Sequence, residues 1–295
     1  MKSQGIGHLL ALICIFVWGV TFISTKILLQ YIGPADILIA RFFLGYLALW
    51  LLFPKFGKAY GKVAELYCLL AGFLGIFVYF YMENVALCYT TASNVGVLIC
   101  LAPFFTAMLS KIIHPKQTSL SLAFFAGLLI SFVGVGMICL AGQEIEFNPL
   151  GDGLAISAAL VWAAYSITLK RIAQFDMPIL LSTRKIFGYS LLFIGGAFLL
   201  TEKKLSIDTL LIPEVYLNLL FLGLLASAAC YAMWTKAVTI IGPGPSTIYI
   251  YLTPVICIIS ANIVLHEQLT KWGFLGTGLV LVGLICSQMS KKLSK

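Results

Sequence analysis

The sequence contains little charge. Asp, Glu, Lys and Arg make up 10% of its 295 residues, whereas about 25% is usual in a soluble domain. Hydrophobic residues make up 61%, and the mean hydropathy is +1.04. A chain of this composition cannot cover its surface with polar groups, so a water-soluble globular protein is excluded.

The sequence also lacks the short motifs of common enzymes. The stretch HEQLT at 266–270 stops short of the zinc motif HExxH, and neither GxSxG nor the nucleotide-binding GxxxxGK[ST] occurs. The eight cysteines lie in apolar runs without a CxxC pair, which is typical of small buried hydrophobes. We therefore predict no enzyme activity, no ATP-binding site, no cofactor and no metal.

Long apolar runs take the place of these motifs. A membrane-spanning helix needs about 20 apolar residues at a rise of about 1.5 Å each. The runs are continuous, which favours helices over alternating barrel strands, and the first has no cleavage pattern of a signal peptide. We predict an all-α membrane protein with ten transmembrane helices near 9–29, 36–53, 66–88, 91–111, 120–140, 151–170, 180–200, 215–237, 246–265 and 272–290.

Basic residues concentrate on one side of this topology. Ten helices place both termini on the same side, together with Lys55, Lys58, Lys62 and Arg171, whereas an opposite loop carries Glu144. The positive-inside rule then places both termini of this multi-pass protein in the cytoplasm. The net charge of +8 is dispersed over short loops, so we predict no nucleic-acid partner.

The two halves of the sequence repeat each other. FVWGVTFISTK at 16–26 matches LVWAAYSITLK at 160–170, and RFFLGYLAL from Arg41 matches RKIFGYSLL from Arg184. GLLISFVG and GTGLVLVG share a glycine at each end, which predicts close helix packing. We predict two five-helix units, 7–140 and 150–288. Because five is odd, the second unit is inverted relative to the first, as in transporters that work by alternating access.

These stretches resemble the EamA branch of the drug/metabolite transporter superfamily. The resemblance rests on the Val-Trp-rich first helix, on YTTASNVGVLICLAPFFTAMLS, on YLTPVICIISANIVLHEQLT and on the Gly-spaced last helix. It covers nearly the whole chain and implies two inverted units that transport small molecules, commonly exporting amino acids or related metabolites. HEQLT fits the family's motif after helix 9, but HPKQTS in the first half lacks the acidic residue.

Three ionisable residues, Lys26, Arg41 and Glu83, fall inside apolar runs at similar depth toward the outer leaflet. A charge in the membrane core costs about 2.5–3.5 kcal/mol on insertion scales. We predict that Glu83 lies in the protein interior within reach of Lys26 or Arg41, as a gate or charge pair, and that it is a candidate proton carrier. Alternatively, the two bases extend to the interface.

Polar and aromatic residues are candidates for lining a substrate cavity, because aromatic faces with a few polar groups suit amphipathic metabolites. Pro103 and Pro254 occupy matching places near the middle of their helices, and such breaks are a good sequence pointer to a central site. The cavity candidates are Trp18, Tyr79, Glu83, Asn84, Asn94, Trp162, Tyr165 and Tyr249.

With this resemblance, the sequence predicts a secondary transporter of small organic metabolites, an exporter of amino acids or related amphipathic compounds in a bacterial inner membrane. An alternative is an exchanger of anionic, phosphorylated or nucleotide-like substrates that uses Lys26, Arg41, Arg184 or Lys185. A membrane enzyme or scaffold is a more remote alternative. The expected partners are the substrate and the lipid bilayer, and the sequence leaves a homodimer open.

The predicted topology can be tested by cysteine-accessibility labelling. Cysteines introduced at Lys58 and Lys292 are expected to react from the cytoplasm, and one at Glu144 from outside, because an odd number of spans separates Glu144 from each lysine. Labelling of Glu144 and Lys58 from the same side would contradict the ten-helix count and, with it, the inverted repeat.

Overall fold

A computed structural model describes residues 2–55, 60–113, 115, 122–140, 148–200, 205–241, 249–250, 252–268 and 271–289, so Lys58, Glu144 and Lys292 lie outside the described residues. The described residues form helices and no strands. The α-helices are α1 (Lys2–Leu28), α2 (Pro34–Leu52), α3 (Lys62–Ala71), α4 (Tyr79–Tyr89), α5 (Ala92–Leu98), α6 (Ala102–Ile113), α7 (Leu122–Leu140), α8 (Pro149–Ile172), α9 (Ile179–Leu199), α10 (Ile207–Leu210), α11 (Pro213–Leu220), α12 (Cys230–Ile241), α14 (Thr253–Leu265) and α15 (Lys271–Met289).

Several of these helices join into longer apolar stretches. Six stretches are long and apolar enough to cross a membrane: Gln4–Leu28, Pro34–Leu52, Lys62–Tyr89, Ala92–Ile113, Pro149–Phe175 and Pro213–Ala237. Three shorter apolar helices cover Leu122–Met137, Thr253–Leu265 and Lys271–Cys286. The chain is therefore an all-helical, multi-pass membrane protein, while the number of ten spans stays a prediction.

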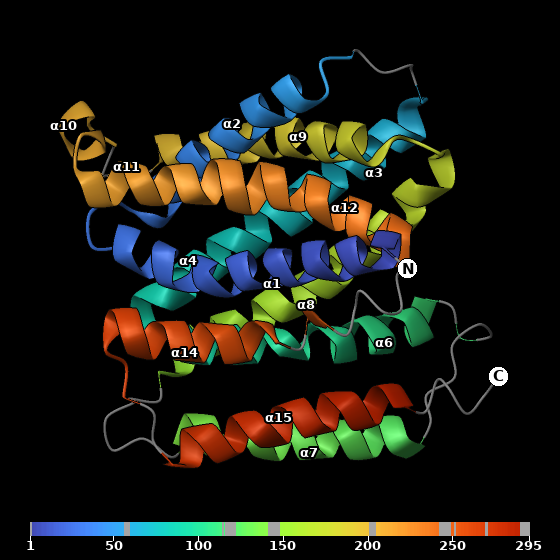
Figure 1. The fold of residues 1–295 in the computed structure, drawn as a ribbon, viewed down its shortest axis with the longest axis vertical. Coiled ribbons are helices and arrows are strands. Elements are labelled where there is room, and N and C mark those ends of the chain that lie inside the picture. The colour runs from blue at the N-terminus through green and yellow to red at the C-terminus, as the bar shows by residue number, and fades with distance from the viewer. Residues whose placement is uncertain are drawn as a thin grey trace.

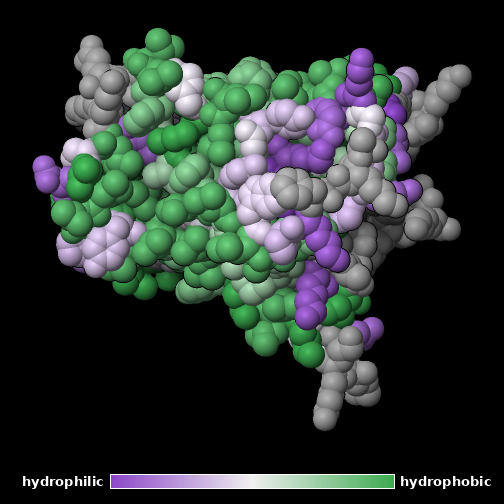
Figure 2. Space-filling view, turned by 90° about the horizontal axis from the view of Figure 1, so that it is seen from above, coloured by the Kyte–Doolittle hydropathy of each residue, from purple (hydrophilic) through white to green (hydrophobic). Residues whose placement is uncertain are grey.

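The long helices lie side by side across the width of the molecule (Figure 1). The beginning of α1 and the end of α15 lie on the same side, and α7 and α15 form a pair at one end of the long axis. Hydrophobic residues cover a wide part of the face in Figure 2, and hydrophilic residues gather mainly over its right part. Such a surface suits a bilayer, in which apolar side chains face lipid.

Two π-helices interrupt the stretches on either side of the bundle centre. The segment η1 (Gly72–Val78) joins α3 to α4, and η4 (Phe221–Ala229) joins α11 to α12. Gly72 and Gly223 are separated by the same number of residues as Pro103 and Pro254, so the two π-helices occupy matching places in the repeat. Short π-segments are rare and occur frequently at functional sites.

The prolines behave differently in the two halves. Pro103 follows a single 3₁₀ turn, η2 (Ile99–Leu101), inside the stretch formed by α5 and α6. Pro254, expected near the middle of its helix, instead lies in the first turn of α14. The physical reason is that the first turn of a helix leaves backbone N–H groups without intrahelical partners, so a proline there loses no hydrogen bond.

Glycines bring helices of the two halves into direct backbone contact. A Cβ atom added to Gly72 would lie 2.7 Å from the Ile186 carbonyl oxygen of α9, and one added to Gly223 would lie 3.1 Å from the Arg41 carbonyl oxygen of α2. The predicted close packing of the Gly-spaced helices also occurs, because α7 packs along α15 and Ser131 Oγ donates to the Val280 carbonyl oxygen at 3.2 Å.

The contact between α7 and α15 predicts that alanine substitution has very different effects on stability at two glycines of α15. A Cβ atom at Gly283 would lie 2.4 Å from the Gly127 carbonyl oxygen, whereas one at Gly278 would meet no atom within 4 Å. Gly283→Ala is expected to lower the free energy of unfolding by about 1–3 kcal/mol, while Gly278→Ala leaves it unchanged or raises it. Thermal unfolding in detergent measures both, and equal melting temperatures would contradict the contact.

Candidate functional site

Arg41 of α2 lies in the protein interior with 4% of its surface exposed. Its Nε donates to Ser227 Oγ of η4 at 3.1 Å, and its guanidinium lies 4.4 Å from the ring centroid of Phe80 and 5.1 Å from that of Phe42. Within the described residues, this is the one hydrogen bond recorded for its five N–H donors. Arg41 therefore does not extend to the membrane interface.

Glu83 of α4 is also buried, with 2% of its surface exposed. It lies about 9 Å along the helix from the end of α4. Arg41 is its partner of opposite charge, and the Tyr79 hydroxyl also interacts with it. Among the described residues, the one direct salt bridge joins Lys185 to Glu65. The Arg41 guanidinium and the Glu83 carboxylate are therefore not in direct contact. We call Arg41, Glu83, Tyr79, Phe80 and Ser227 the Arg41–Glu83 cluster.

Aromatic side chains of both halves surround this cluster. The Tyr79 ring lies 4.7 Å from the Trp162 ring, which lies 5.1 Å from that of Tyr165. Tyr165 packs against Gly75 of η1, where an added Cβ atom would lie 2.2 Å from its ring. The structure thus brings together four of the predicted cavity residues, Tyr79, Glu83, Trp162 and Tyr165, next to Arg41.

Trp18, which matches Trp162 in the repeat, lies beside η4. Its indole N–H donates to the Ala226 carbonyl oxygen at 3.0 Å, and its ring lies 5.3 Å from the Trp234 ring and 6.1 Å from the Tyr231 ring. Tyr231 also interacts with Tyr165. Trp18 therefore binds the π-helix that carries Ser227 and packs against Tyr231.

Lys26, the other predicted partner of Glu83, binds elsewhere. Its ammonium donates to the carbonyl oxygens of Leu87 and Thr90, the latter at 2.7 Å. These carbonyls belong to the last turn of α4 and the residue after it, where no intrahelical N–H remains to bind them. The hypothesis of a Lys26–Glu83 pair is therefore wrong, because Lys26 caps a helix end.

The turn between α4 and α5 collects polar side chains from four elements. Thr90 Oγ1 donates to Asp152 Oδ1 of α8 at 2.9 Å, and Asn94 Nδ2 donates to Thr90 Oγ1 at 3.1 Å. Glu267, which follows α14, accepts hydrogen bonds from the backbone N–H groups of Ala92 and Ser93 at 2.8 and 3.1 Å. We call these residues, with Lys26, the α4–α5 turn network.

Three predicted cavity residues lie away from the Arg41–Glu83 cluster. Asn94 holds the α4–α5 turn network, and Asn84 donates to the Pro34 carbonyl oxygen at 3.3 Å at the start of α2. Tyr249 shares a hydrogen bond of 2.9 Å with His8, near the beginning of α1. An amide or phenol in an apolar sequence can hydrogen-bond to other groups of the protein as well as to a substrate. Composition alone therefore did not distinguish a structural role from substrate binding.

The remaining basic candidates also have structural partners. Arg184 donates to the carbonyl oxygens of Phe53 at 2.5 Å and Lys55 at 2.7 Å, and its guanidinium lies 3.7 Å from the Trp50 ring centroid. Lys185 pairs with Glu65. Sequence reasoning missed Ser227, Phe80 and Tyr231, and it also missed both π-helices, which leave no periodic signal in the sequence.

The chain matches the model of the EamA-like transporter family over residues 5–140 and 149–288. Curated relatives include an uncharacterized transporter of Archaeoglobus fulgidus, 28% identical over 88% of this chain and 90% of its own length. The uncharacterized transporter YvbV of Bacillus subtilis is 25% identical over 94% and 90% of the two chains. A probable amino-acid metabolite efflux pump of Escherichia coli is 28% identical over 93% and 92%.

A solved crystal structure shares the fold, with a TM-score of 0.67 at 16% identity over 100% of this chain and 99% of that chain. The two matched segments of the family model together cover nearly the whole sequence. The predicted resemblance is confirmed, and the chain belongs to the EamA-like transporter family.

Proposed function

We propose that this transporter exports amino acids or closely related amphipathic metabolites by alternating access. One observation carries the proposal: Arg41 and Glu83 are buried, opposite in charge and not in direct contact, with aromatic rings around them. A substrate carboxylate fits the unused N–H donors of Arg41, and a substrate ammonium fits Glu83. The rings suit the apolar part of such a substrate.

The packing of the helices supports two inverted five-helix units. α1 packs against α12 and α14, and α8, its counterpart in the repeat, packs against α4 and α6. In the same way α2 packs against η4, and α9 packs against η1. A two-fold relation in the membrane plane gives this exchange of partners. We propose ten spans with both termini in the cytoplasm of a bacterial cell.

Exchange of multiply charged anions is a weaker candidate. It needs several bases that face the substrate, yet Lys26, Arg184 and Lys185 bind backbone carbonyls or Glu65. Only Arg41 remains available among the four bases named for that function. A single base suits one carboxylate better than a phosphorylated or nucleotide-like substrate.

Competition at Glu83 gives a route to proton coupling. An ionised Glu83 attracts a substrate ammonium, and a protonated Glu83 does not, so the site holds a proton or an amine but not both. When the substrate is released on the more acidic outer side, Glu83 takes up a proton. The empty site then carries this proton inward as it returns to the cytoplasmic side. Arg41 keeps its charge at every physiological pH, so it would hold the carboxylate in both states.

The first test is substrate-induced thermal stabilisation of Arg41→Gln across a metabolite panel, followed by uptake into proteoliposomes. A hydrogen bond to a charged group contributes about 1.5–3 kcal/mol, so the affinity for amino acids is expected to fall at least about tenfold. Arg184→Gln is the matched control, because it removes the equivalent base of the other half. It should lower thermal stability and leave affinity unchanged. Equal affinity of Arg41→Gln and the wild type would refute the carboxylate site.

The second test is the pH dependence of Glu83→Gln, which keeps the size of the side chain and removes its proton. Substrate binding through Arg41 and the rings should persist, while the pH dependence of binding and pH-driven uptake are lost. Asp152→Asn, which changes a buried carboxylate of the α4–α5 turn network, should lower stability and keep the pH dependence. Wild-type pH dependence in Glu83→Gln would exclude Glu83 as the proton carrier.

A further inference from the structure

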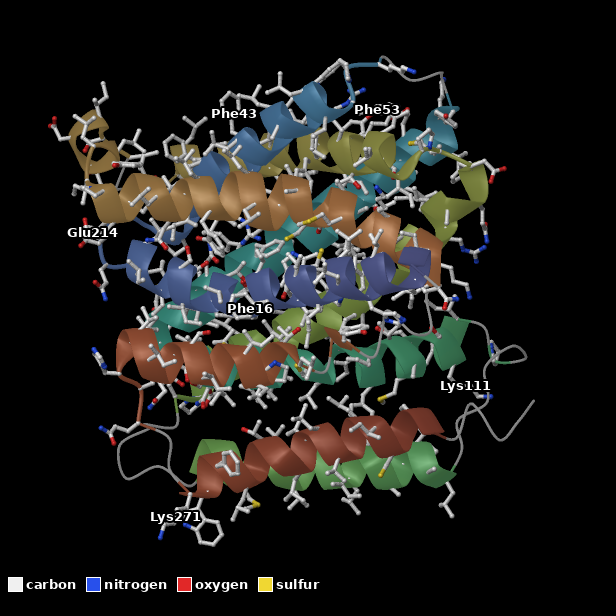
Figure 3. The ribbon with its side chains drawn as sticks, in the orientation of Figure 1. Phe16, Phe43, Phe53, Lys111, Glu214 and Lys271 are labelled. Atoms are coloured by element: carbon white, nitrogen blue, oxygen red, sulfur yellow. The ribbon has the colours of Figure 1, made fainter. Side chains whose placement is uncertain are left out.

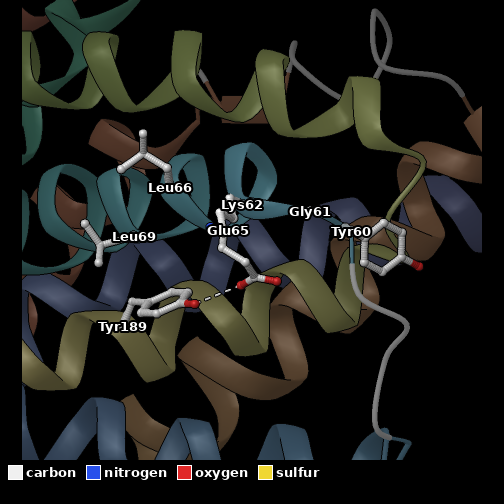
Figure 4. A pocket seen from close by; sticks show the side chains of 7 residues that line it. All are labelled: Tyr60, Gly61, Lys62, Glu65, Leu66, Leu69 and Tyr189. Atoms are coloured by element: carbon white, nitrogen blue, oxygen red, sulfur yellow. Dashed lines mark hydrogen bonds between the residues drawn. The ribbon is translucent and has the colours of Figure 1, made fainter.

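A pocket of about 510 Å³ opens between α3 and α9, away from the Arg41–Glu83 cluster. Figure 4 shows Glu65, Leu66 and Leu69 of α3 on one side and Tyr189 of α9 on the other. Because α3 belongs to the first half of the repeat and α9 to the second, anything bound in this pocket contacts both halves.

Part of the pocket lining is polar. Glu65 accepts hydrogen bonds from Lys185 and, at 2.8 Å, from the Tyr189 hydroxyl. The side chains of Lys185 and Glu65 are 23% and 31% exposed, so the ion pair reaches the surface. The charges of Glu65 and Lys185 cancel. The exposed Lys62 at the beginning of α3 therefore gives the pocket a net positive charge.

The walls of the pocket are apolar and face outward. Leu66, which lines the pocket, is 63% exposed. Val63, outside the lining and one turn before Leu66 on α3, is 59% exposed. In a membrane protein such side chains contact hydrocarbon. A partly exposed ion pair beside them lies more favourably at headgroup depth than in the hydrocarbon, where charged side chains are costly. Headgroup depth is consistent with the place of Lys62, since α3 begins there.

We infer that this pocket binds one anionic phospholipid, with the headgroup phosphate at Lys62 and the beginning of an acyl chain along Leu66 and Leu69. Basic pockets between membrane helices recognise lipid headgroups in this way. The leucines favour a lipid over a free anion, because a free phosphate gains nothing from an apolar wall. The bound lipid would bridge α3 and α9 and so stabilise the arrangement in which these helices are close.

The test uses the full-length protein, purified in detergent and exposed to phosphatidylglycerol, to phosphatidylcholine with the same acyl chains, or to glycerol 3-phosphate. Native mass spectrometry counts retained lipid, and thermal unfolding reports stabilisation. We expect phosphatidylglycerol to be retained preferentially and to raise the melting temperature more than phosphatidylcholine does. Lys62→Gln should lose this preference. The control Lys170→Gln, which changes an exposed lysine at the end of α8, should keep it.

Three outcomes would overturn the inference. Equal retention of the two lipids by the wild type would show no anionic site. Equal loss in Lys62→Gln and Lys170→Gln would indicate a general effect of surface charge. Full stabilisation by glycerol 3-phosphate would indicate a free-anion site without a lipid chain. None of these measurements involves transport, so the result stands apart from the proposed substrate.

Discussion

A helix end inside a membrane protein must find partners for its backbone groups within the protein, and the α4–α5 turn network shows how this chain meets that constraint. Lys26 binds the last carbonyls of α4, and Glu267 binds the first N–H groups of α5. The charges come from segments far apart in the sequence. The two charged caps therefore hold α1 and the end of α14 against the same turn, and loss of either would leave buried backbone groups without partners.

The same constraint explains why two equivalent arginines differ. Arg184 donates hydrogen bonds to the carbonyl oxygens of Phe53 and Lys55, which follow the end of α2. Arg41 faces η4, and in the described part of the chain its hydrogen bond goes to the Ser227 hydroxyl. The residue matching Ser227 in η1 is the apolar Ile76. The duplicated unit has thus become chemically asymmetric, because Arg41 and Glu83 of the Arg41–Glu83 cluster both come from the first half.

Much of the fold can be predicted from the sequence, because the composition and length of apolar runs identify membrane helices. The cost of burying a carboxylate likewise indicated an interior place for Glu83. Other features depend on backbone groups that the sequence does not display. Asn84 and Asn94 bind a carbonyl and a turn, and nothing in their local sequence distinguishes this from binding a substrate. Ser227 meets Arg41 only because a π-helix sets its direction, and π-helices share the composition of α-helices.

The π-helices also determine where the chain tolerates a change in its residue count. A π-turn holds one residue more than an α-turn, so η1 contains an insertion absorbed without a loop. Deleting one residue between Gly72 and Val78 would let this segment return to α-helical bonding, and α4 would keep its direction relative to α3. Deleting Met82 from the regular part of α4 would instead rotate the rest of that helix by about 100°. Glu83 would then turn away from Arg41, although neither side chain had been replaced.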